Sequence, residues 1–225
     1  MKKIFIQDDN ISRILDIKNQ DCDSRIKIAE REKSSSILAF LANDKSHCVR
    51  VAVAKNHNTS EEILAHLAKD VEWAVRAEVA KNPSTTKETL MDLAKNDDEY
   101  LNVKIAVAQN SKATADVLDE LAKNKEFYYK GVLLAVVKNP NTSTKTLAEL
   151  AKDEYLIRYA VSKNPKTPAD VLDELAKGIC DYIRVNVAEN PNTSIRTLEK
   201  LAQDEFYMVR ETAERRLNIA IKNFE

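Results

Sequence analysis

Glycine is almost missing from this chain of 225 residues, which contains only Gly131 and Gly178, whereas average usage is about 7%. A loop that cradles a phosphate group needs several glycines in close succession, because its backbone must approach the ligand with φ angles that other residues avoid. The sequence therefore excludes a phosphate-binding loop of the Walker type and a dinucleotide-binding fingerprint.

Cysteine and histidine are scarce as well. The cysteines are Cys22, Cys48 and Cys180, and no two of them form a C-x-x-C pair. This spacing suggests neither a disulfide framework nor a tetrahedral metal site, and it fits a reducing compartment. The histidines are His47, His57 and His66, and no serine or cysteine recurs near them as a catalytic partner. We expect no catalytic residue, no metal and no cofactor, with a zinc site at the histidines as the alternative.

Long hydrophobic runs are missing too. The N-terminal apolar run, residues 4–6, is too short for the core of a signal peptide, and no later stretch could span a bilayer. The net charge is -1, because 35 Lys and Arg stand against 36 Asp and Glu, which argues against a protein built around neutralising phosphate. We expect a cytoplasmic chain that makes no membrane contact.

What the chain does contain is a repeat. The pattern Leu-x-x-Leu-Ala recurs at intervals of about 26 residues, and its Leu-Ala pairs begin at Leu41, Leu67, Leu93, Leu121, Leu150, Leu175 and Leu201. Within each copy the two leucines and the alanine fall at i, i+3 and i+4, which places them on one stripe of a helix. The sequence thus predicts seven tandem repeats, each containing one such helix, which we name the leucine helix.

Hydroxyl residues and an asparagine turn precede the leucine helices. Thr59 and Thr85 open capping-box patterns, and Thr167 is followed by Pro168 at the expected first helical position. We predict that each threonine oxygen accepts a hydrogen bond from an amide of the first turn. The asparagines ahead of these threonines are Asn56, Asn82, Asn110, Asn139, Asn164 and Asn190. They could bind a ligand, but we favour amides that satisfy turn backbone between neighbouring repeats.

A second apolar segment lies upstream of each asparagine. These segments span residues 49–53, 75–79, 103–107, 132–136, 157–161 and 183–187. Taken alone, residues 49–53 alternate like a strand, so a horseshoe of leucine-rich repeats is an alternative. Across the copies, however, the first and fifth positions are always Val or Ile whereas the third varies, and i, i+4 is helical spacing. We predict a short helix of about two turns, which we name the valine helix.

The lengths of the repeats define a module. The distance from the start of each valine helix to the next Leu-Ala pair is constant, so every length change falls in the turn from a leucine helix to the following valine helix. A valine helix and the leucine helix after it therefore form a rigid module, and the variable turns form an edge of the kind that repeat arrays use for binding. We assign residues 1–24 to an N-terminal cap, 25–204 to the repeats and 205–225 to a C-terminal capping helix.

The unit Val-Arg-x-Ala-Val-Ala-x-Asn-Pro-x-Thr, followed by Leu-x-x-Leu-Ala-x-Asp, resembles the leucine-rich repeat variant family, most closely at residues 49–70 and 183–204. The resemblance covers residues 25–213. It implies an all-α, right-handed superhelix, a solenoid akin to armadillo and HEAT arrays, in which the valine helix could be a 3₁₀-helix. A founding member carries an iron–sulfur cluster in a cysteine-rich N-terminal module. This chain has only Cys22 near its start, so the cofactor is not carried over, and the family shares no activity.

A basic residue recurs in the valine helices. The basic column consists of Arg25, Arg50, Arg76, Lys104, Arg158, Arg184 and Arg210, interrupted only by Leu133. One interpretation is a ladder for an acidic partner or a nucleic-acid backbone, as in HEAT-like modules. We favour a structural interpretation, in which the column pairs with acids that follow the Leu-Ala pairs. These acids are Asp44, Asp70, Asp153 and Asp204, with Asn96 and Asn124 as substitutes.

Aromatic residues gather in the variable turns. They are Trp73, Tyr100, Phe127, Tyr128, Tyr129, Tyr155, Tyr182, Phe206 and Tyr207. Single rings could plug the gap between successive helices, but such packing does not need three rings together, as at residues 127–129. Tyr and Phe are favoured interface anchors. We therefore predict that these turns contact a partner, above all at Phe127, Tyr128 and Tyr129.

These patterns together predict a non-enzymatic, monomeric scaffold that binds a protein or peptide. A HEAT-like nucleic-acid-binding module that uses the basic column is the first alternative. An enzyme or cofactor carrier resembling HEAT-type lyases is the second.

Overall fold

The computed structural model describes residues 8–96, 100–124 and 126–222, and within these ranges the chain forms sixteen α-helices and one 3₁₀ turn without a β-strand. The predicted N-terminal apolar run, residues 4–6, lies outside the described residues. The chain forms two compact units, Met1–Leu121 and Ala122–Glu225, and each is described by itself. The all-α class and the paired arrangement of helices are confirmed.

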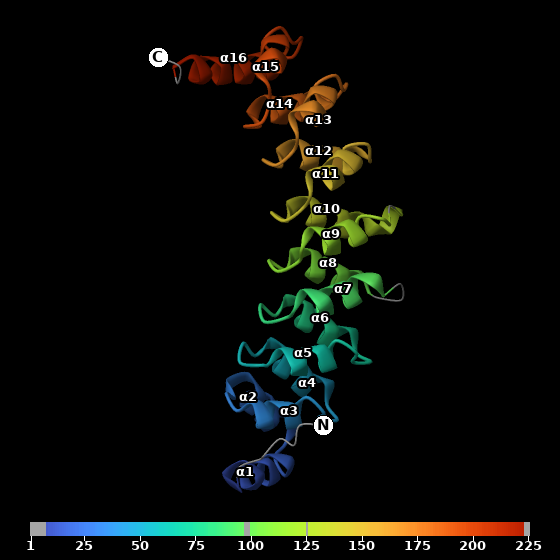
Figure 1. Cartoon of the computed structure of the whole chain (residues 1–225), viewed down its shortest axis with the longest axis vertical. Helices are drawn as coiled ribbons and strands as arrows, with labels where there is room; N and C mark the ends of the chain where they lie inside the picture. Colours follow the sequence, from blue (N-terminus) through green and yellow to red (C-terminus); the bar gives the residue numbers. More distant parts are fainter. Residues whose placement is uncertain (1–7, 97–99, 125, 223–225) are drawn as a thin grey trace. The chain divides into compact units, whose positions relative to one another are not determined.

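The first unit alternates leucine and valine helices after α1 (Asp8–Lys18) and α2 (Cys22–Arg31) (Figure 1). Its leucine helices are α3 (Ser35–Leu41), α5 (Glu61–Leu67), α7 (Lys87–Lys95) and α9 (Ala115–Leu121). Its valine helices are α4 (His47–Lys55), α6 (Trp73–Lys81) and α8 (Leu101–Gln109). Helices α2, α4, α6 and α8 pack against one another in that order, and α7 packs against α9.

The second unit repeats the arrangement. It begins with the 3₁₀ turn η1 (Phe127–Tyr129) and ends with α16 (Tyr207–Lys222). Its valine helices are α10 (Lys130–Lys138), α12 (Tyr155–Lys163) and α14 (Asp181–Glu189), and its leucine helices are α11 (Thr144–Leu150), α13 (Ala169–Leu175) and α15 (Ile195–Leu201). Helices α10, α12, α14 and α16 pack in succession.

The core consists of the side chains that the periodicity marks. Val49 and Val53 of α4 are fully buried, and so are Leu64 of α5 and Leu90 of α7. Because each pair of helices buries its apolar stripe against the next pair, a pair depends on its neighbours for its core.

The valine helices are α-helices of 9 residues, as in α4, α6 and α8. The 3₁₀ form implied by the family resemblance is therefore wrong for these segments. Val75 and Val79 are both buried, and i, i+4 pairs share one face only when a turn holds about 3.6 residues; a 3₁₀-helix would align i with i+3 instead. Within the described chain, 3₁₀ geometry is confined to η1.

The capping prediction is wrong by one residue. The residues at the N-cap positions include Ser60, Thr86, Ser143, Pro168 and Ser194. The hydroxyls of Thr86, Ser143 and Ser194 accept from amides of the first turn. The preceding threonine instead donates: Thr59 Oγ1 lies 2.6 Å from the carbonyl oxygen of Val53. Carbonyls at the end of a helix need such donors because they have no amide partner within the helix.

The asparagine column joins successive repeats. Asn82 is buried, and its Nδ2 donates to the carbonyl oxygens of Ala54 and Asn56 at 2.7 and 3.1 Å, in the preceding turn. Its Oδ1 accepts from the N–H of Ser84 at 2.8 Å. The same arrangement recurs at Asn56, Asn110 and Asn190. The prediction that these amides satisfy backbone between neighbouring repeats is confirmed.

Candidate interaction surface

The basic column is anchored to the fold where an aspartate follows the leucine helix. In the first unit, Arg50 Nε lies 2.6 Å from Asp70 Oδ2, and Arg50 Nη2 lies 2.8 Å from Oδ1. Asp70 Oδ1 also accepts from the N–H of Glu72 at 2.9 Å. The remaining arm of Arg50, Nη1, donates to the carbonyl oxygen of Asp44 at 2.8 Å. Both partners are nearly buried, so the pair joins α4 to the turn after α5 within one module rather than facing solvent. The contact with Asp44 joins this module to the one before it.

Two further members of the column form the same bidentate pair. Arg25 donates to Asp44 at 2.7 and 3.1 Å, and Arg184 donates to Asp204 at 2.7 and 2.9 Å. For Arg25, Arg50 and Arg184, the structural interpretation of the column is therefore confirmed.

The column uses backbone carbonyls elsewhere. Arg76 Nη1 donates to the carbonyl of Asp70 at 2.5 Å, and Arg210 Nη1 donates to that of Asp204 at 2.6 Å. Lys104 is buried, and its Nζ donates to the carbonyl of Ala94 at 2.9 Å.

The ion pairs lower the pKa of the aspartates. Hydrogen bonds from Arg184 lower the pKa of Asp204 below its ordinary value, against the effect of burial. Burial by itself would raise the pKa of Asp70, but hydrogen bonds from Arg50 and from the N–H of Glu72 outweigh it, and the net shift is downward. Both acids are therefore ionised at neutral pH and compensate the charge of the arginines that they bind.

Arg158 of α12 departs from this pattern. Its half-buried side chain forms no hydrogen bond or ion pair with any described residue. The position after α13 that holds an aspartate in other modules is occupied by Gly178. In the module before it, Leu133 replaces the basic residue, and Asp153 accepts from the N–H of Glu154 at 2.7 Å. The predicted use of Asp153 as a partner of the column is therefore wrong within the described chain.

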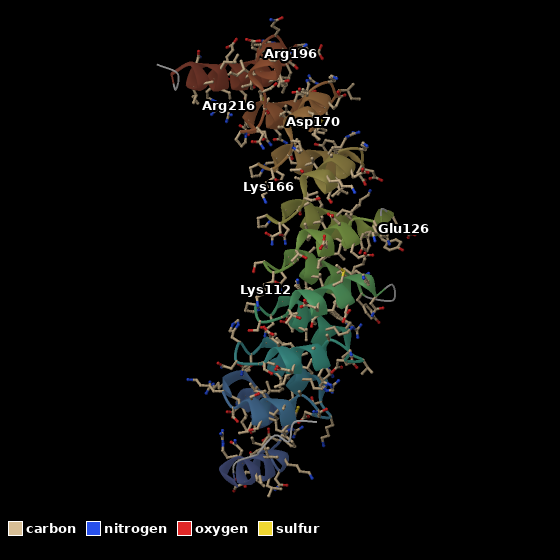
Figure 2. The ribbon with its side chains drawn as sticks, in the orientation of Figure 1. Lys112, Glu126, Lys166, Asp170, Arg196 and Arg216 are labelled. Carbon is tan, nitrogen blue, oxygen red and sulfur yellow. The ribbon has the colours of Figure 1, made fainter. Side chains whose placement is uncertain are left out.

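Six of the aromatic residues predicted to contact a partner are exposed at, or just ahead of, the beginning of a valine helix or of α16. They are Trp73, Tyr100, Tyr128, Tyr155, Tyr182 and Tyr207, and their exposure ranges from 37% for Trp73 to 61% for Tyr128 and Tyr207. The rings of Trp73 and Tyr100 lie 5.8 Å apart in the first unit. In the second unit, Glu126 beside Tyr128 and Lys166 in an asparagine turn project to opposite sides (Figure 2). The rings lie at the N-terminal ends of their helices, whereas the asparagine turns follow the C-terminal ends of the valine helices, so the two belong to different edges.

The three adjacent rings at residues 127–129 have different environments. Tyr128 is exposed, and a hydrogen bond to Glu126 raises the pKa of its phenol. Tyr129 is only 4% exposed and belongs to the core. The side chain of Phe127 lies outside the described residues. Of this predicted cluster, Tyr128 is the exposed ring among the described side chains.

A cavity of about 710 Å³ adjoins Arg158 in the second unit. Its walls come from α11, α12, α13, the turn after α13 and the start of α14. They include the apolar side chains of Val171, Ile179 and Ile183 beside the charged side chain of Arg158. A site of this size and composition suits a ligand with both an apolar part and a charged group.

The described residues contain neither a cluster of metal-ligating side chains nor a helix that could span a membrane. No cluster of three or more His, Cys, Asp or Glu side chains in that part of the chain could hold a metal ion. Cys22, Cys48 and Cys180 are free thiols. Among the described helices, none has the length and apolar character needed to cross a bilayer.

Comparison with known proteins identifies the fold. No family model and no curated protein sequence matches the chain. A solved structure of a leucine-rich repeat variant, with a repetitive structural motif described as novel, is similar to this chain. The match covers 93% of this chain and 82% of the chain in that structure, with a TM-score of 0.67 and 21% sequence identity. The chain therefore has the helical repeat fold of a leucine-rich repeat variant, as its repeat pattern indicates.

Two further solved structures are similar at a lower level. An engineered protein is 16% identical, covers 95% of this chain and 98% of its own, and has a TM-score of 0.28. A designed armadillo repeat protein is 14% identical, with coverages of 92% and 98% and a TM-score of 0.26.

Proposed function

We propose that the chain is a non-enzymatic scaffold that binds a protein or peptide along the turns between each leucine helix and the next valine helix. The supporting observation is the recurrence of an exposed ring at, or just ahead of, the start of successive helices, from Trp73 to Tyr207. Packing within a repeat does not require a ring in solvent, whereas Tyr and Trp dominate the binding energy of protein interfaces.

The finer architecture belongs to the same proposal. Seven repeats over residues 25–204 wind into a right-handed superhelix, with caps at residues 1–24 and 205–225. The scaffold acts as a cytoplasmic monomer, so that the ring-bearing turns stay accessible to a partner.

Binding to nucleic acid through the basic column has weaker support. Arg25, Arg50 and Arg184 already hold aspartates in bidentate pairs. A phosphate backbone would have to displace those carboxylates, which leaves a nearly buried acid without compensation.

A selection from a phage-displayed peptide library tests the proposal. Selected peptides are measured by fluorescence polarisation against the wild type and against a ring variant that carries Tyr128→Ser, Tyr182→Ser and Tyr207→Ser. We expect the ring variant to bind roughly tenfold more weakly, because interface rings typically contribute more than the 1.4 kcal/mol that a tenfold change requires.

A matched variant controls for general surface change. It carries Lys138→Ser, Lys163→Ser and Glu189→Ser, exposed positions at the other end of the valine helices, and it should bind like the wild type. Equal binding by the ring variant would refute the proposal. Tight binding of duplex DNA that weakens steeply with salt would favour the nucleic-acid alternative instead.

A further inference from the structure

Gly178 has the backbone position that an aspartate has in other modules. Its N–H donates to the carbonyl of Leu175 at 3.2 Å, as the N–H of Asp70 does in its own turn at 3.1 Å. Its carbonyl accepts from Arg184 Nη1 at 2.9 Å, as the carbonyl of Asp70 accepts from Arg76. The backbones of the two turns therefore make equivalent hydrogen bonds, but the turn of Asp70 has a carboxylate and the turn of Gly178 does not.

The two donors that bind the aspartate in the module of Arg50 have counterparts here, Arg158 and the N–H of Cys180, which line the same cavity as Gly178 and have no hydrogen-bond partner among the described residues. The guanidinium of Arg158 forms no hydrogen bond or ion pair, and the N–H of Cys180 donates no hydrogen bond. In the module of Arg50, the equivalent donors bind Asp70: the guanidinium at 2.6 and 2.8 Å, and the N–H of Glu72 at 2.9 Å. The turn after α13 thus retains the donor set of a carboxylate site.

The cavity beside these donors is open to solvent and partly apolar. Gly178 and Cys180 line it, and so does Ile179, whose side chain is 98% exposed. Tyr155, one of the exposed rings, lies near Cys180, and the pKa of its phenol is raised first by desolvation and then by this neighbour. The cavity therefore adjoins the ring-bearing edge.

The acids that line the cavity leave Arg158 available. Asp170, labelled in Figure 2 on α13, and Glu174 both contribute to the wall. Neither forms a hydrogen bond or ion pair with Arg158, and Glu174 binds Lys177 at 2.6 Å. An arginine that no neighbouring acid binds can receive a carboxylate specifically, because its planar fork matches the two oxygens.

We propose that this cavity binds the side-chain carboxylate of an aspartate or glutamate in a partner peptide. Arg158 and the N–H of Cys180 donate to the carboxylate, and an apolar neighbour of the acidic residue packs on Ile179. This inference rests on the proposed function, because it names the chemistry of the partner that the scaffold recognises.

Three variants define the test. Gly178→Asp supplies the carboxylate from within the chain, and because the φ angle of Gly178 is not positive, an aspartate can adopt its backbone. A Cβ there would lie 3.3 Å from the carbonyl oxygen of Leu175, so a small shift is needed; Gly178→Ala controls for this shift. Arg158→Gln removes the guanidinium fork.

The probe is a phage-displayed peptide library, fused through its C-termini so that no free terminal carboxylate is present. Peptides are selected for binding to the wild type in preference to Gly178→Asp. We expect an Asp or Glu at a common position in them. Replacing that residue by its amide, or using Arg158→Gln or Gly178→Asp, should weaken binding roughly tenfold, the size expected for a charge-assisted hydrogen bond. Gly178→Ala should retain the affinity within about twofold.

The opposite results overturn the inference. They are the absence of any peptide that prefers the wild type over Gly178→Asp, equal affinity after the acid-to-amide change, or displacement of the peptides by duplex DNA without dependence on their acid. Thermal melts add an independent readout: Gly178→Asp should melt above Gly178→Ala, because its carboxylate binds Arg158, and a lower melting temperature would contradict the assigned donors.

The ring variant separates the two proposals, since Tyr128, Tyr182 and Tyr207 do not line the cavity. Peptides that depend on Arg158 but not on the rings support the cavity and refute the ring-bearing edge. Peptides that depend on the rings but bind Arg158→Gln and Gly178→Asp as tightly as the wild type support the scaffold and refute the cavity.

Discussion

At the residue scale, the pair of Arg50 and Asp70 makes a charged column part of the fold. The side chains are only 14% and 7% exposed, so removing one partner leaves the other charge poorly solvated. We predict that Asp70→Asn lowers the free energy of unfolding by about 2 kcal/mol at pH 7, measured by chemical denaturation. Asp92→Asn, at an exposed carboxylate of α7 outside any ion pair of the described residues, should change it little.

The stabilisation by the pair of Arg50 and Asp70 should depend on pH in a defined direction. The pKa of Asp70 is lower in the folded chain than its ordinary value. Its stabilising contribution is therefore complete above about pH 4 and is lost as the pH falls through the folded-state pKa. The unfolding free energies of wild type and Asp70→Asn should converge in acid. A difference that stays constant down to about pH 2 would contradict the pairing.

The threonine turns show what residue patterns can and cannot predict. Thr59 and Ser60 are adjacent hydroxyl residues, and either could cap the following helix. The pattern predicts that a cap is present, but the path of the turn decides which hydroxyl reaches an amide. Here that path turns Thr59 back toward the carbonyl of Val53, a contact for which the sequence offers no local signal.

At the element scale, the helices were predictable because buried positions obey one spacing in every copy. Val75 and Val79 identify a helix only when six copies are compared, since one copy alone alternates like a strand. For the adjacent rings at residues 128 and 129, no comparison between copies could show which ring is buried. Which ring enters the core depends on the η1 turn, a feature of one repeat.

The asparagine turns connect elements of neighbouring modules, and Asn82 allows a direct test. Asn82→Ala removes two hydrogen bonds to the preceding turn and one within its own. It leaves buried carbonyls with fewer donors, so we predict a loss of roughly 2 to 3 kcal/mol in unfolding free energy.

Asn102→Ala is the matched control for Asn82→Ala. Asn102 is exposed on α8, and its side chain makes no hydrogen bond with the described residues. Thermal and denaturant unfolding of the two variants should therefore differ clearly. Equal stability would mean that the amide ladder contributes nothing to the stacking of modules.

At the scale of the whole molecule, the scaffold was predictable, but the cavity was not. The basic column and the acids were both visible in the sequence, yet the signal at Gly178 appears only when the two columns are aligned module by module. Even then, sequence does not reveal that the backbone of Gly178 follows the path of Asp70, or that a cavity opens beside Arg158. Such facts depend on packing between modules.

Coupling between nearest neighbours predicts that a module can be removed. Deleting residues 75–102 joins Ala74 to Val103, so that α8 takes the place of α6 against α4. Asn110 then faces the carbonyls of Ala54 and Asn56, which Asn82 occupies in the intact chain.

The shortened chain should remain folded, because each contact that the deletion removes is replaced by an equivalent contact from the next module. We expect a monodisperse protein in light scattering, with an unchanged helical signal per residue in circular dichroism and a cooperative melt. The control is a deletion of residues 75–88, about half as many residues. It would place a leucine helix where a valine helix belongs, so the unfolding of this variant should lose cooperativity. If both deletions aggregate alike, the module boundaries are wrong; if both fold alike, the packing does not depend on the repeat.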